Sequence, residues 1–460
     1  MALSQAKIFE CLSDVATPQD ARALFRTAHV LGGSIGGLLA ARVLSDHSEH
    51  VVIIEPDTTG AGCDPRPGVP QGYQVHILLP GGRTQLERWY PGIVQQALDE
   101  GALLSPPQQT ALYVDGVQEV TTSNAELVTS SRPFLESVIR RQTLALPNVE
   151  MRTGRAVGVE CDRDVVNKVR YRTSCGESVE ATDFVVDATG RGSRLSDWLA
   201  KGGWPIPELE RLKAGIRYFT ARFARPPGWT GFNIFIHRYS AGFPSDGLCG
   251  ALATAIENQQ WALTLAYFDG ERERMSEEDF RARCRELHPF YDEVVSNQQQ
   301  GALISYRHPE SRWRHFESLG RFPARLAPMG DAVASFNPVF GQGMSSAALH
   351  ASCLSDYLRS DPDLNAPARR FMDLQKVVVE AAWGFSTRAD AARLGIVEEP
   401  VTEDDRWQAW AMQQVLSAVG RDEQVTKAFR AAAFMTTHPA TLLAPELVRR
   451  ALAVNTKQDA

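Results

Sequence analysis

The sequence has no long apolar run and no marked excess of one charge. Its 48 Lys and Arg residues stand against 55 Asp and Glu residues, and no basic run is present. This balance argues against a nucleic-acid-binding surface and leaves a small molecule as the expected partner. The longest glycine-rich apolar stretch, residues 28–41, is too short to cross a bilayer. The first twenty residues lack the cationic head and apolar core of a signal peptide, so we expect a cytoplasmic protein without a membrane span.

Cysteine pairing is also not indicated. None of the seven cysteines stands in CxxC spacing, so neither a metal site nor a disulfide framework is expected, and a reducing compartment fits such a chain. The cysteines are Cys11, Cys63, Cys161, Cys175, Cys249, Cys284 and Cys353.

A glycine-rich turn lies between two apolar runs near the N-terminus. We predict a strand over His29–Leu31, a turn over Gly32–Gly37 (GGSIGG), a helix over 38–44 and a second strand over Val51–Glu55. This order is typical of dinucleotide-binding folds, in which backbone N–H groups at the helix N-terminus approach a pyrophosphate.

Individual residues of this motif have separate tasks. Gly32 makes the turn, and Gly37 lets the helix pack closely on the strand. Ser34 stands where the middle glycine is usual, before Ile35, and places a hydroxyl near the phosphates. Glu55 ends the second strand, where a carboxylate accepts hydrogen bonds from a ribose diol. An acid at this position selects FAD or NAD rather than NADP.

A second glycine motif decides between FAD and NAD. Gly330-Asp331-Ala332 follows an apolar strand, and residues 338–344 (PVFGQGM) then open a helix. This pair resembles the second FAD fingerprint of the aromatic-hydroxylase (group A) flavoprotein monooxygenases. The resemblance implies that Asp331 bonds a ribityl hydroxyl and that the helix N-terminus stabilises the anionic reduced flavin. The further cofactor residues it implies are Pro338, Gly341, Gln342, Gly343 and Met344, the last four around the pyrimidine ring.

Three other positions resemble cofactor contacts. Gly190, in Asp187-Ala-Thr-Gly190, matches the ATG-type segment of glutathione-reductase-like FAD folds, near the adenine side. Arg66 matches an arginine of the hydroxylases that reaches the FAD diphosphate, and Arg132 matches one beside the ribityl chain. For both arginines a solvated surface position is the alternative.

The resemblance is closest to the FAD epoxidases of polyether polyketide biosynthesis, through Gly68–Leu78, Asp187–Ser193 and Gly330–Ser345. It implies a monooxygenase with non-covalent FAD. NAD(P)H reduces the flavin, O2 adds at C4a, and the hydroperoxide gives oxygen to an alkene or electron-rich ring of a lipophilic secondary metabolite.

The implied fold class is α/β, a Rossmann-like FAD-binding domain of the glutathione-reductase/aromatic-hydroxylase type with an inserted β-sheet substrate domain and a C-terminal helical region. We expect an N-terminal extension over 1–28, FAD-binding parts over 29–200 and 326–365, a substrate domain over 201–325 and the helical region over 366–460.

Local patterns add two expectations. Helix formers predict a short helix over Asp20–Arg26. The alternating segments 149–153, 157–161 and 168–173 predict a β-meander that leads to a strand at Phe184–Val186.

Aromatic residues of the predicted substrate sheet suit a lipophilic ligand, although most residues of this kind belong to a core. They are Tyr218, Phe219, Phe223, Phe232, Phe235 and Tyr267. His76 and His237 are candidate bases, but strand histidines are more often structural, and we assign no catalytic residue.

Alternative functions share the same FAD motifs. An aromatic hydroxylase would oxygenate a phenol, and an alkene reductase or dehydrogenase would transfer hydrogen without oxygen. A tryptophan-type halogenase would need a WxWxIP segment, from which Trp407-Gln-Ala-Trp410 differs in spacing. A non-catalytic carrier would leave the flavin-ring motif without a task. Retention of FAD and reaction with oxygen separate these classes.

Overall fold

The computed structural model of the chain describes residues 3–57, 64–124, 126–239, 246–396 and 402–456. Of the single residues named above, Cys63 lies outside these ranges. Among the described residues, no helix is both long and apolar enough to cross a membrane.

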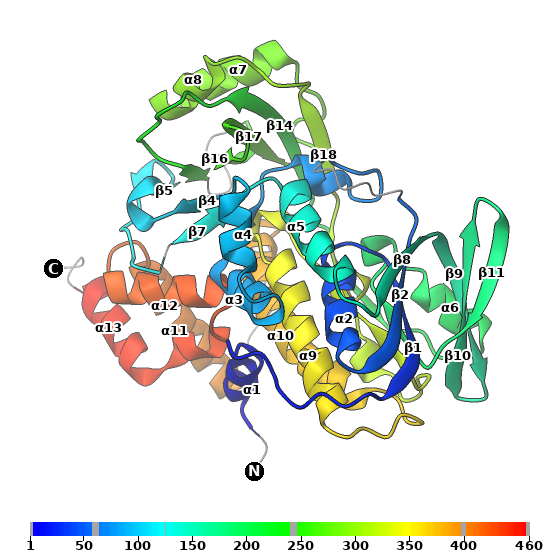
Figure 1. Ribbon diagram of the computed structural model, residues 1–460. Helices are drawn as coiled ribbons and strands as arrows, with labels where there is room; N and C mark the ends of the chain where they lie inside the picture. Colours follow the sequence, from blue (N-terminus) through cyan, green and yellow to red (C-terminus); the bar gives the residue numbers. More distant parts are fainter. Residues whose placement is uncertain (1–2, 58–63, 125, 240–245, 397–401, 457–460) are drawn as a thin grey trace.

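A five-stranded parallel sheet forms the centre of the nucleotide-binding part (Figure 1). Its strands, in spatial order, are β20 (Leu326–Pro328), β12 (Phe184–Asp187), β1 (Phe25–Leu31), β2 (Ser48–Glu55) and β8 (Val149–Thr153). The apolar runs at the ends of β1 and β2 are buried, as expected for parallel strands covered on both faces.

Helices on this sheet bring distant segments together. Four of these helices come from the N-terminal half of the chain: α2 (Ile35–Ser45), α3 (Pro80–Trp89), α4 (Ile93–Asp99) and α5 (Arg132–Leu144). Two more come from the C-terminal half: α9 (Gly343–Arg359) and α10 (Arg369–Arg393). The α2 helix packs against α9, and α9 packs against α10, so both glycine motifs meet beside one sheet (Figure 1).

The β-meander stands at one edge of the molecule, next to α6 (Leu195–Lys201). Its strands are β9 (Arg155–Asp162), β10 (Val165–Thr173) and β11 (Gly176–Ala181). The prediction that residues 149–153 belong to this meander is wrong, because β8 pairs in parallel with β2. An edge strand of a parallel sheet has one open side and shows the same alternation as a meander strand, so the pattern could not separate them.

A seven-stranded sheet lies above the nucleotide-binding part (Figure 1). Its order is β18 (Ile304–His308), β14 (Ile216–Ala224), β17 (Gln260–Phe268), β16 (Leu248–Ile256), β15 (Ile234–Arg238), β5 (Thr110–Val114) and β6 (Val117–Gln118). Helices α7 (Glu277–Leu287) and α8 (Pro289–Val295) cover its outer face. Strands β5 and β6 come from a segment ahead of residue 201, so this sheet draws on the chain before the predicted substrate domain.

Two small sheets complete the strands. One has the order β3 (Ile77–Leu78), β7 (Leu127–Thr129) and β4 (Leu103–Ser105), and the other β13 (Leu209–Leu212), β19 (Ser311–Arg314) and β21 (Ala334–Ser335).

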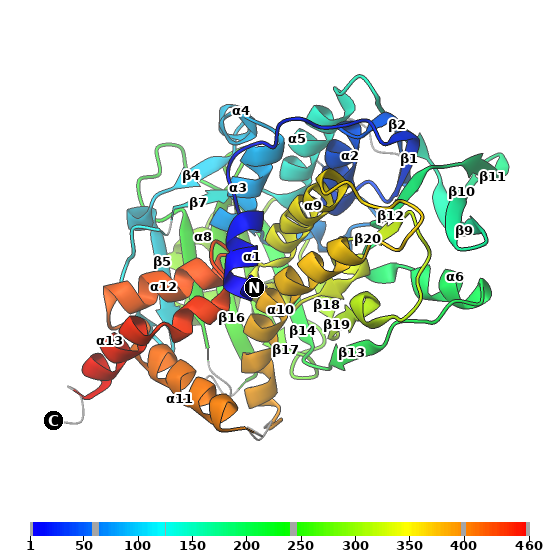
Figure 2. The same cartoon turned by 90° about the horizontal axis from the view of Figure 1, so that it is seen from below.

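The C-terminal helices gather on one side of the molecule (Figure 2). They are α11 (Glu403–Ala418), α12 (Glu423–Ala433) and α13 (Pro445–Thr456). A capping box starts α11, since the Thr402 side chain accepts from the Asp405 N–H and the Asp405 side chain accepts from the Thr402 N–H. These helices have a small core of their own, which includes Val415, Val425 and Leu442.

The N-terminal helix is α1 (Gln5–Leu12), and the helix predicted over Asp20–Arg26 is wrong. Phe25 already begins β1, inside the predicted extension, and Asp20 has a φ of +63°. Pairing of β1 with two neighbouring strands outweighs the helix propensity of this stretch. The α1 helix buries Phe9 fully, near the His438 ring, which ties the N-terminus to the C-terminal region.

Candidate active site

One cavity of about 1960 Å³ extends between the parallel sheet and the seven-stranded sheet. It is larger than typical small-molecule sites of roughly 300–1,000 Å³, so it has room for a dinucleotide together with a second ligand. The predicted cofactor residues that line it are Gly32, Ser34, Ile35, Glu55, Arg66, Arg132, Gly190, Asp331, Pro338, Gly341, Gly343 and Met344. The structure therefore brings both glycine motifs and both arginines to one space.

The phosphate turn needs glycine for steric reasons. Gly32 has a φ of +103°, and a Cβ there would lie 2.4 Å from the Ala188 carbonyl oxygen. Gly37 does not line the cavity, because it packs against the turn itself. A Cβ on Gly37 would lie 1.8 Å from the Gly32 carbonyl oxygen. The N-terminus of α2 therefore opens directly toward the cavity, where its backbone N–H groups favour an anion.

Glu55 is held in place at the end of β2. Its Oε2 accepts a hydrogen bond from the Gly33 N–H at 2.6 Å, and its Oε1 accepts from the Asp57 N–H at 3.0 Å. Arg66 Nη1 lies 2.9 Å from the same Oε1. These contacts fix the carboxylate beside the phosphate turn, at the position where we expect the ribose.

Glu136 is a site residue that the motif analysis missed. It lies one turn into α5, and its carboxylate pairs with Arg66 Nε at 2.7 Å, Arg132 Nη1 at 3.1 Å and Arg140 Nη2 at 2.7 Å. The Ser34 hydroxyl donates to it at 2.8 Å. The i, i+4 spacing of Arg132, Glu136 and Arg140 was the available signal in the sequence.

Electrostatics in this cluster favour the charged carboxylate. Burial alone would raise the pKa of Glu136, but the adjacent Arg132, Arg66 and Arg140 lower it further than burial raises it. The Arg66 and Arg132 side chains are only 12% and 10% exposed, so neither is a solvated surface arginine. Arg66 Nη2 is buried and lacks a hydrogen-bond partner within the described ranges, which leaves a donor for a ligand anion.

Asp331 offers a hydrogen-bond acceptor to a ligand, whereas Arg66 offers a donor. Its carboxyl group lines the cavity and makes no hydrogen bond with any residue in the part of the chain that the structure describes. Burial raises its pKa, against the lowering effect of Arg132, Arg191 and Arg314. A partly buried acceptor that faces the cavity is free to accept a hydrogen bond from a ligand or from water.

Helices α9 and α10 hold the turn that carries Asp331. The Gly330 N–H donates to His350 Nδ1 at 3.0 Å, and Gln375 Nε2 donates to the Pro328 carbonyl oxygen at 3.0 Å. Burial lowers the pKa of His350 to about 3, so its ring is neutral at pH 7 and Nδ1 can accept the hydrogen bond.

The loop of the second glycine motif is anchored at both ends. The Asn337 side chain donates to Asp390 Oδ2 on α10 at 2.8 Å and accepts from the Val339 N–H. Gln342 Nε2 donates to the Ala433 carbonyl oxygen on α12 at 3.1 Å. The Gln342 side chain thus holds the loop against α12 and does not line the cavity, although the resemblance grouped Gln342 with the residues around the pyrimidine ring.

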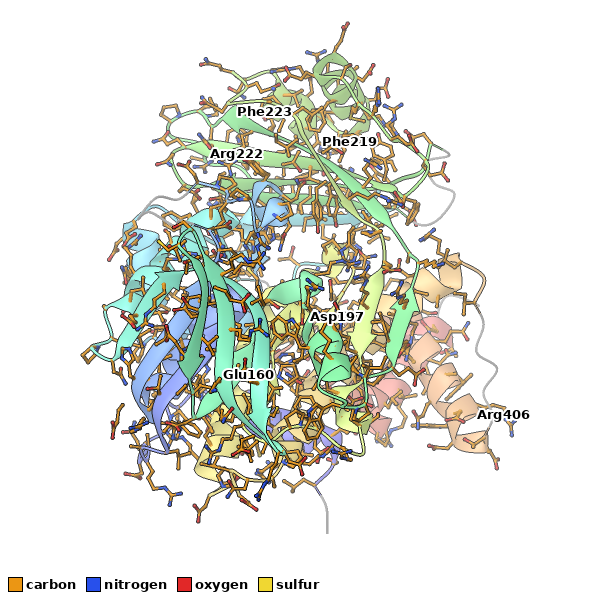
Figure 3. All side chains as sticks on the ribbon, turned by 90° about the vertical axis from the view of Figure 1, so that its right-hand side faces the viewer. Glu160, Asp197, Phe219, Arg222, Phe223 and Arg406 are labelled. Carbon is orange, nitrogen blue, oxygen red and sulfur yellow. The ribbon has the colours of Figure 1, made fainter. Side chains whose placement is uncertain are left out.

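The predicted aromatic residues divide between two faces of one sheet. Tyr218 lines the cavity, whereas the neighbouring Phe219 packs on the outer face beneath α7 and α8 (Figure 3). The residues that share the outer core with Phe219 are Phe223, Phe235 and Tyr267, with Phe232 partly buried against them. Alternate residues of a strand point to opposite faces, so all the predicted aromatic residues except Tyr218 belong to the outer core.

Other side chains close the far end of the cavity. They are Leu79, Arg238, Phe340, Phe385, Phe429 and Phe434, from segments far apart in the sequence. His76 lines the cavity, whereas the His237 ring packs against Phe235 and Tyr291 on the outer face of the sheet. Burial lowers the pKa of each histidine to about 4. Within the described residues, no group of three or more His, Cys, Asp or Glu side chains could hold a metal ion.

Solved structures with the same architecture include flavin-dependent enzymes. The flavin-dependent brominase Bmp2 aligns over 94% of this chain and 99% of its own, with a TM-score of 0.64 at 15% identity. The p-nitrophenol 4-monooxygenase PnpA from Pseudomonas putida DLL-E4 aligns over 91% and 100%, with a TM-score of 0.63 at 18% identity. PqsL, a probable FAD-dependent monooxygenase from Pseudomonas aeruginosa, aligns over 80% and 99%, with a TM-score of 0.60 at 20% identity.

The chain therefore has the fold of the FAD-dependent, aromatic-hydroxylase type, and the predicted fold class is confirmed. Protein Rv3254 from Mycobacterium tuberculosis (strain ATCC 25618 / H37Rv) is 33% identical over 353 residues, which cover 72% of this chain and 73% of that protein. The chain belongs to the family of Protein Rv3254. No protein-family model matches it.

Proposed function

We propose that the protein is an FAD-dependent monooxygenase that uses NAD(P)H and O2 to oxygenate a lipophilic small molecule. The observation that carries this proposal is that one cavity is lined by the phosphate turn, by Arg66 and Arg132 of the Glu136 cluster and by the turn of Asp331. The named functions of Bmp2, PnpA and PqsL support the same class of chemistry.

The residues present fit FAD at both ends. Arg66 offers a buried donor without a partner among the described residues, next to a helix N-terminus that favours a diphosphate. Asp331 offers an unengaged acceptor for a ribityl hydroxyl. The first turn keeps its shape only with glycine at residue 32, since a Cβ there would strike the Ala188 backbone.

FAD, when bound, supplies hydride acceptance from NAD(P)H and the activation of O2. The chain's own residues bind and orient it. The N-terminus of α9, at Gly343, faces the cavity and favours negative charge at the flavin ring. The seven-stranded sheet and α12 form the walls that exclude water from the reacting atoms.

Epoxidation of an alkene is the first candidate reaction, with aromatic hydroxylation as the alternative. Hydroxylation of a phenol benefits from a base that deprotonates the ring, whereas an alkene needs only to be oriented. The cavity histidines His76 and His308 have pKa values of about 4 and 3, lowered by burial, so they are weak bases. This favours a reaction without proton abstraction.

Anaerobic reduction followed by rapid mixing with oxygen tests the proposed function. NADH or NADPH should bleach the flavin of the purified protein, and oxygen should then give a transient absorbance unlike either the oxidised or the reduced flavin. Flavin that neither nucleotide reduces would contradict the proposal. Reduction with hydrogen transfer to alkenes in the absence of O2 would favour the reductase.

A further inference from the structure

Arg238 occupies a fixed position at the far end of the cavity. It ends β15, where it pairs with Gly250 of β16 on one side and Val114 of β5 on the other. Its guanidinium carbon lies 5.7 Å from the centroid of the Phe340 ring, which belongs to the second glycine motif. The side chain is therefore placed between the seven-stranded sheet and the loop expected to hold the flavin ring.

The charge of Arg238 is not matched by the protein. Its guanidinium group forms neither an ion pair nor a hydrogen bond with any residue in the ranges that the structure describes. The carboxylate that acts on its charge, Glu119, pairs instead with Arg430, whose Nη2 lies 3.1 Å from Glu119 Oε2. The other Arg430 nitrogen, Nη1, donates to Thr122 Oγ1 at 2.7 Å, so that pair is complete without Arg238.

Burial adds to this imbalance. It lowers the pKa of Arg238, and the opposing effects of Glu119 and Cys249 do not restore the usual value. An arginine nevertheless stays protonated at neutral pH, so a positive charge remains in the cavity.

The surroundings of this charge are aromatic. The Phe340 and Phe385 rings lie 6.4 Å apart, and the Phe385 and Phe429 rings lie 5.2 Å apart. Leu79 and Phe434 line the same end of the cavity. A partly buried cation among apolar walls favours an anionic partner, and a guanidinium group matches a carboxylate in a bidentate pair.

We propose that Arg238 selects a lipophilic carboxylic acid, whose carboxylate pairs with the guanidinium group while its apolar body lies among Phe340, Phe385 and Phe429. That this acid is the molecule oxygenated rests on the proposed function. Its binding does not, because the charge pair forms before any flavin chemistry.

Paired probes at equilibrium test the charge preference directly. Isothermal titration of the FAD-loaded protein with 2-naphthoate, biphenyl-4-carboxylate and decanoate is compared with titration by the three corresponding carboxamides. We expect the wild type to bind at least one acid about ten-fold or more tightly than its amide, as a charge-assisted pair predicts. Arg238→Gln should abolish this preference, and Arg238→Lys should retain part of it.

A matched control is available in the same sheet. Arg222, on β14 (Figure 3), does not line the cavity, so Arg222→Gln should leave the preference unchanged. The FAD content of each variant shows whether the cofactor site is intact.

The proposal would be overturned if the wild type bound no acid more tightly than its amide, or if Arg238→Gln kept the preference for acids. It would also be overturned if Arg238→Gln were impaired only in flavin reduction by NADH or NADPH. The last result would assign the guanidinium group to the nicotinamide nucleotide. Lack of oxygen chemistry in a protein that still prefers acids would defeat the proposed function alone.

Discussion

The buried carboxylate of Glu136 forms ion pairs with three arginine side chains, beside the phosphate turn. Removing one partner of a buried ion pair leaves uncompensated charge and typically costs about 3–5 kcal/mol. Glu136→Gln should therefore lower the free energy of unfolding of the apoprotein by that amount at neutral pH. Denaturant titration of the two proteins measures the difference.

Acid should remove this difference. The folded pKa of Glu136 is lowered, so its stabilising effect is present above the unfolded pKa of about 4.3 and is lost as the pH falls through the folded value. Glu126→Gln is the control, because Glu126 is partly exposed and pairs with Arg83 at 2.8 Å on the surface, and its loss should cost about 1 kcal/mol or less. Equal losses in the two variants would contradict the role of Glu136.

Substitution of Asp331 should leave the stability of the apoprotein unchanged and lower its FAD content. Because its partly buried carboxyl group has no hydrogen-bond partner in the described ranges, Asp331→Ala should not lower the stability of the apoprotein. It should nevertheless purify with little flavin, since the expected ribityl contact is lost. Thermal unfolding of the apoprotein and the ratio of FAD to chain measure the two effects.

A variant that loses stability but keeps full FAD occupancy would show that Asp331 has a structural role and no contact with the cofactor. This outcome would also weaken the assignment of the second glycine motif.

Single residues were predictable from sequence where a motif carried them. Gly32, Glu55 and Asp331 all reach the cavity, because spacing along one strand, turn and helix determines their placement. Arg238 was not predictable, since its exceptional feature is the absence of a partner. That feature depends on Glu119 and Arg430, which come from other parts of the chain.

At the scale of elements, the two adjacent glycines of α2 should differ sharply. A Cβ on Gly36 would meet nothing closer than Ala347 Cβ at 3.8 Å, whereas a Cβ on Gly37 would lie 1.8 Å from the Gly32 carbonyl oxygen. Gly36→Ala should therefore be neutral or stabilise the protein by up to about 1 kcal/mol, the usual gain of alanine over glycine in a helix.

Gly37→Ala should lower the free energy of unfolding by several times the roughly 1 kcal/mol that Gly36→Ala can add, because the new Cβ would push α2 away from β1. Thermal unfolding and FAD content compare the two variants. Similar behaviour of both would contradict the close approach of helix and strand.

Elements defined by local periodicity were predicted well, including α2 and the strands β2, β9 and β12. Errors arose where a partner decides the structure. The stretch Asp20–Arg26 contains helix formers, but β1 pairs with β2 and β12 from Phe25 onward. The alternation of β8 was read correctly as a strand, whereas its parallel partner β2 lies almost a hundred residues earlier.

At the scale of the whole molecule, the two ends of the cavity differ in how they are built. The cofactor end uses glycine turns and helix N-termini, which have sequence signatures. The far end combines a strand terminus, a loop and two helices, α10 and α12, whose apolar side chains resemble any core in sequence. The far end of the cavity therefore could be located only from the fold.

The stoichiometry of FAD is the most direct test of the whole account. Purified protein, incubated with excess FAD and then freed of unbound flavin, is assayed for flavin per chain by absorbance after denaturation. The account predicts close to one FAD per chain in the wild type and a large loss in Asp331→Ala. A wild-type protein that retains almost no FAD, although folded, would contradict it and favour a carrier built on this fold.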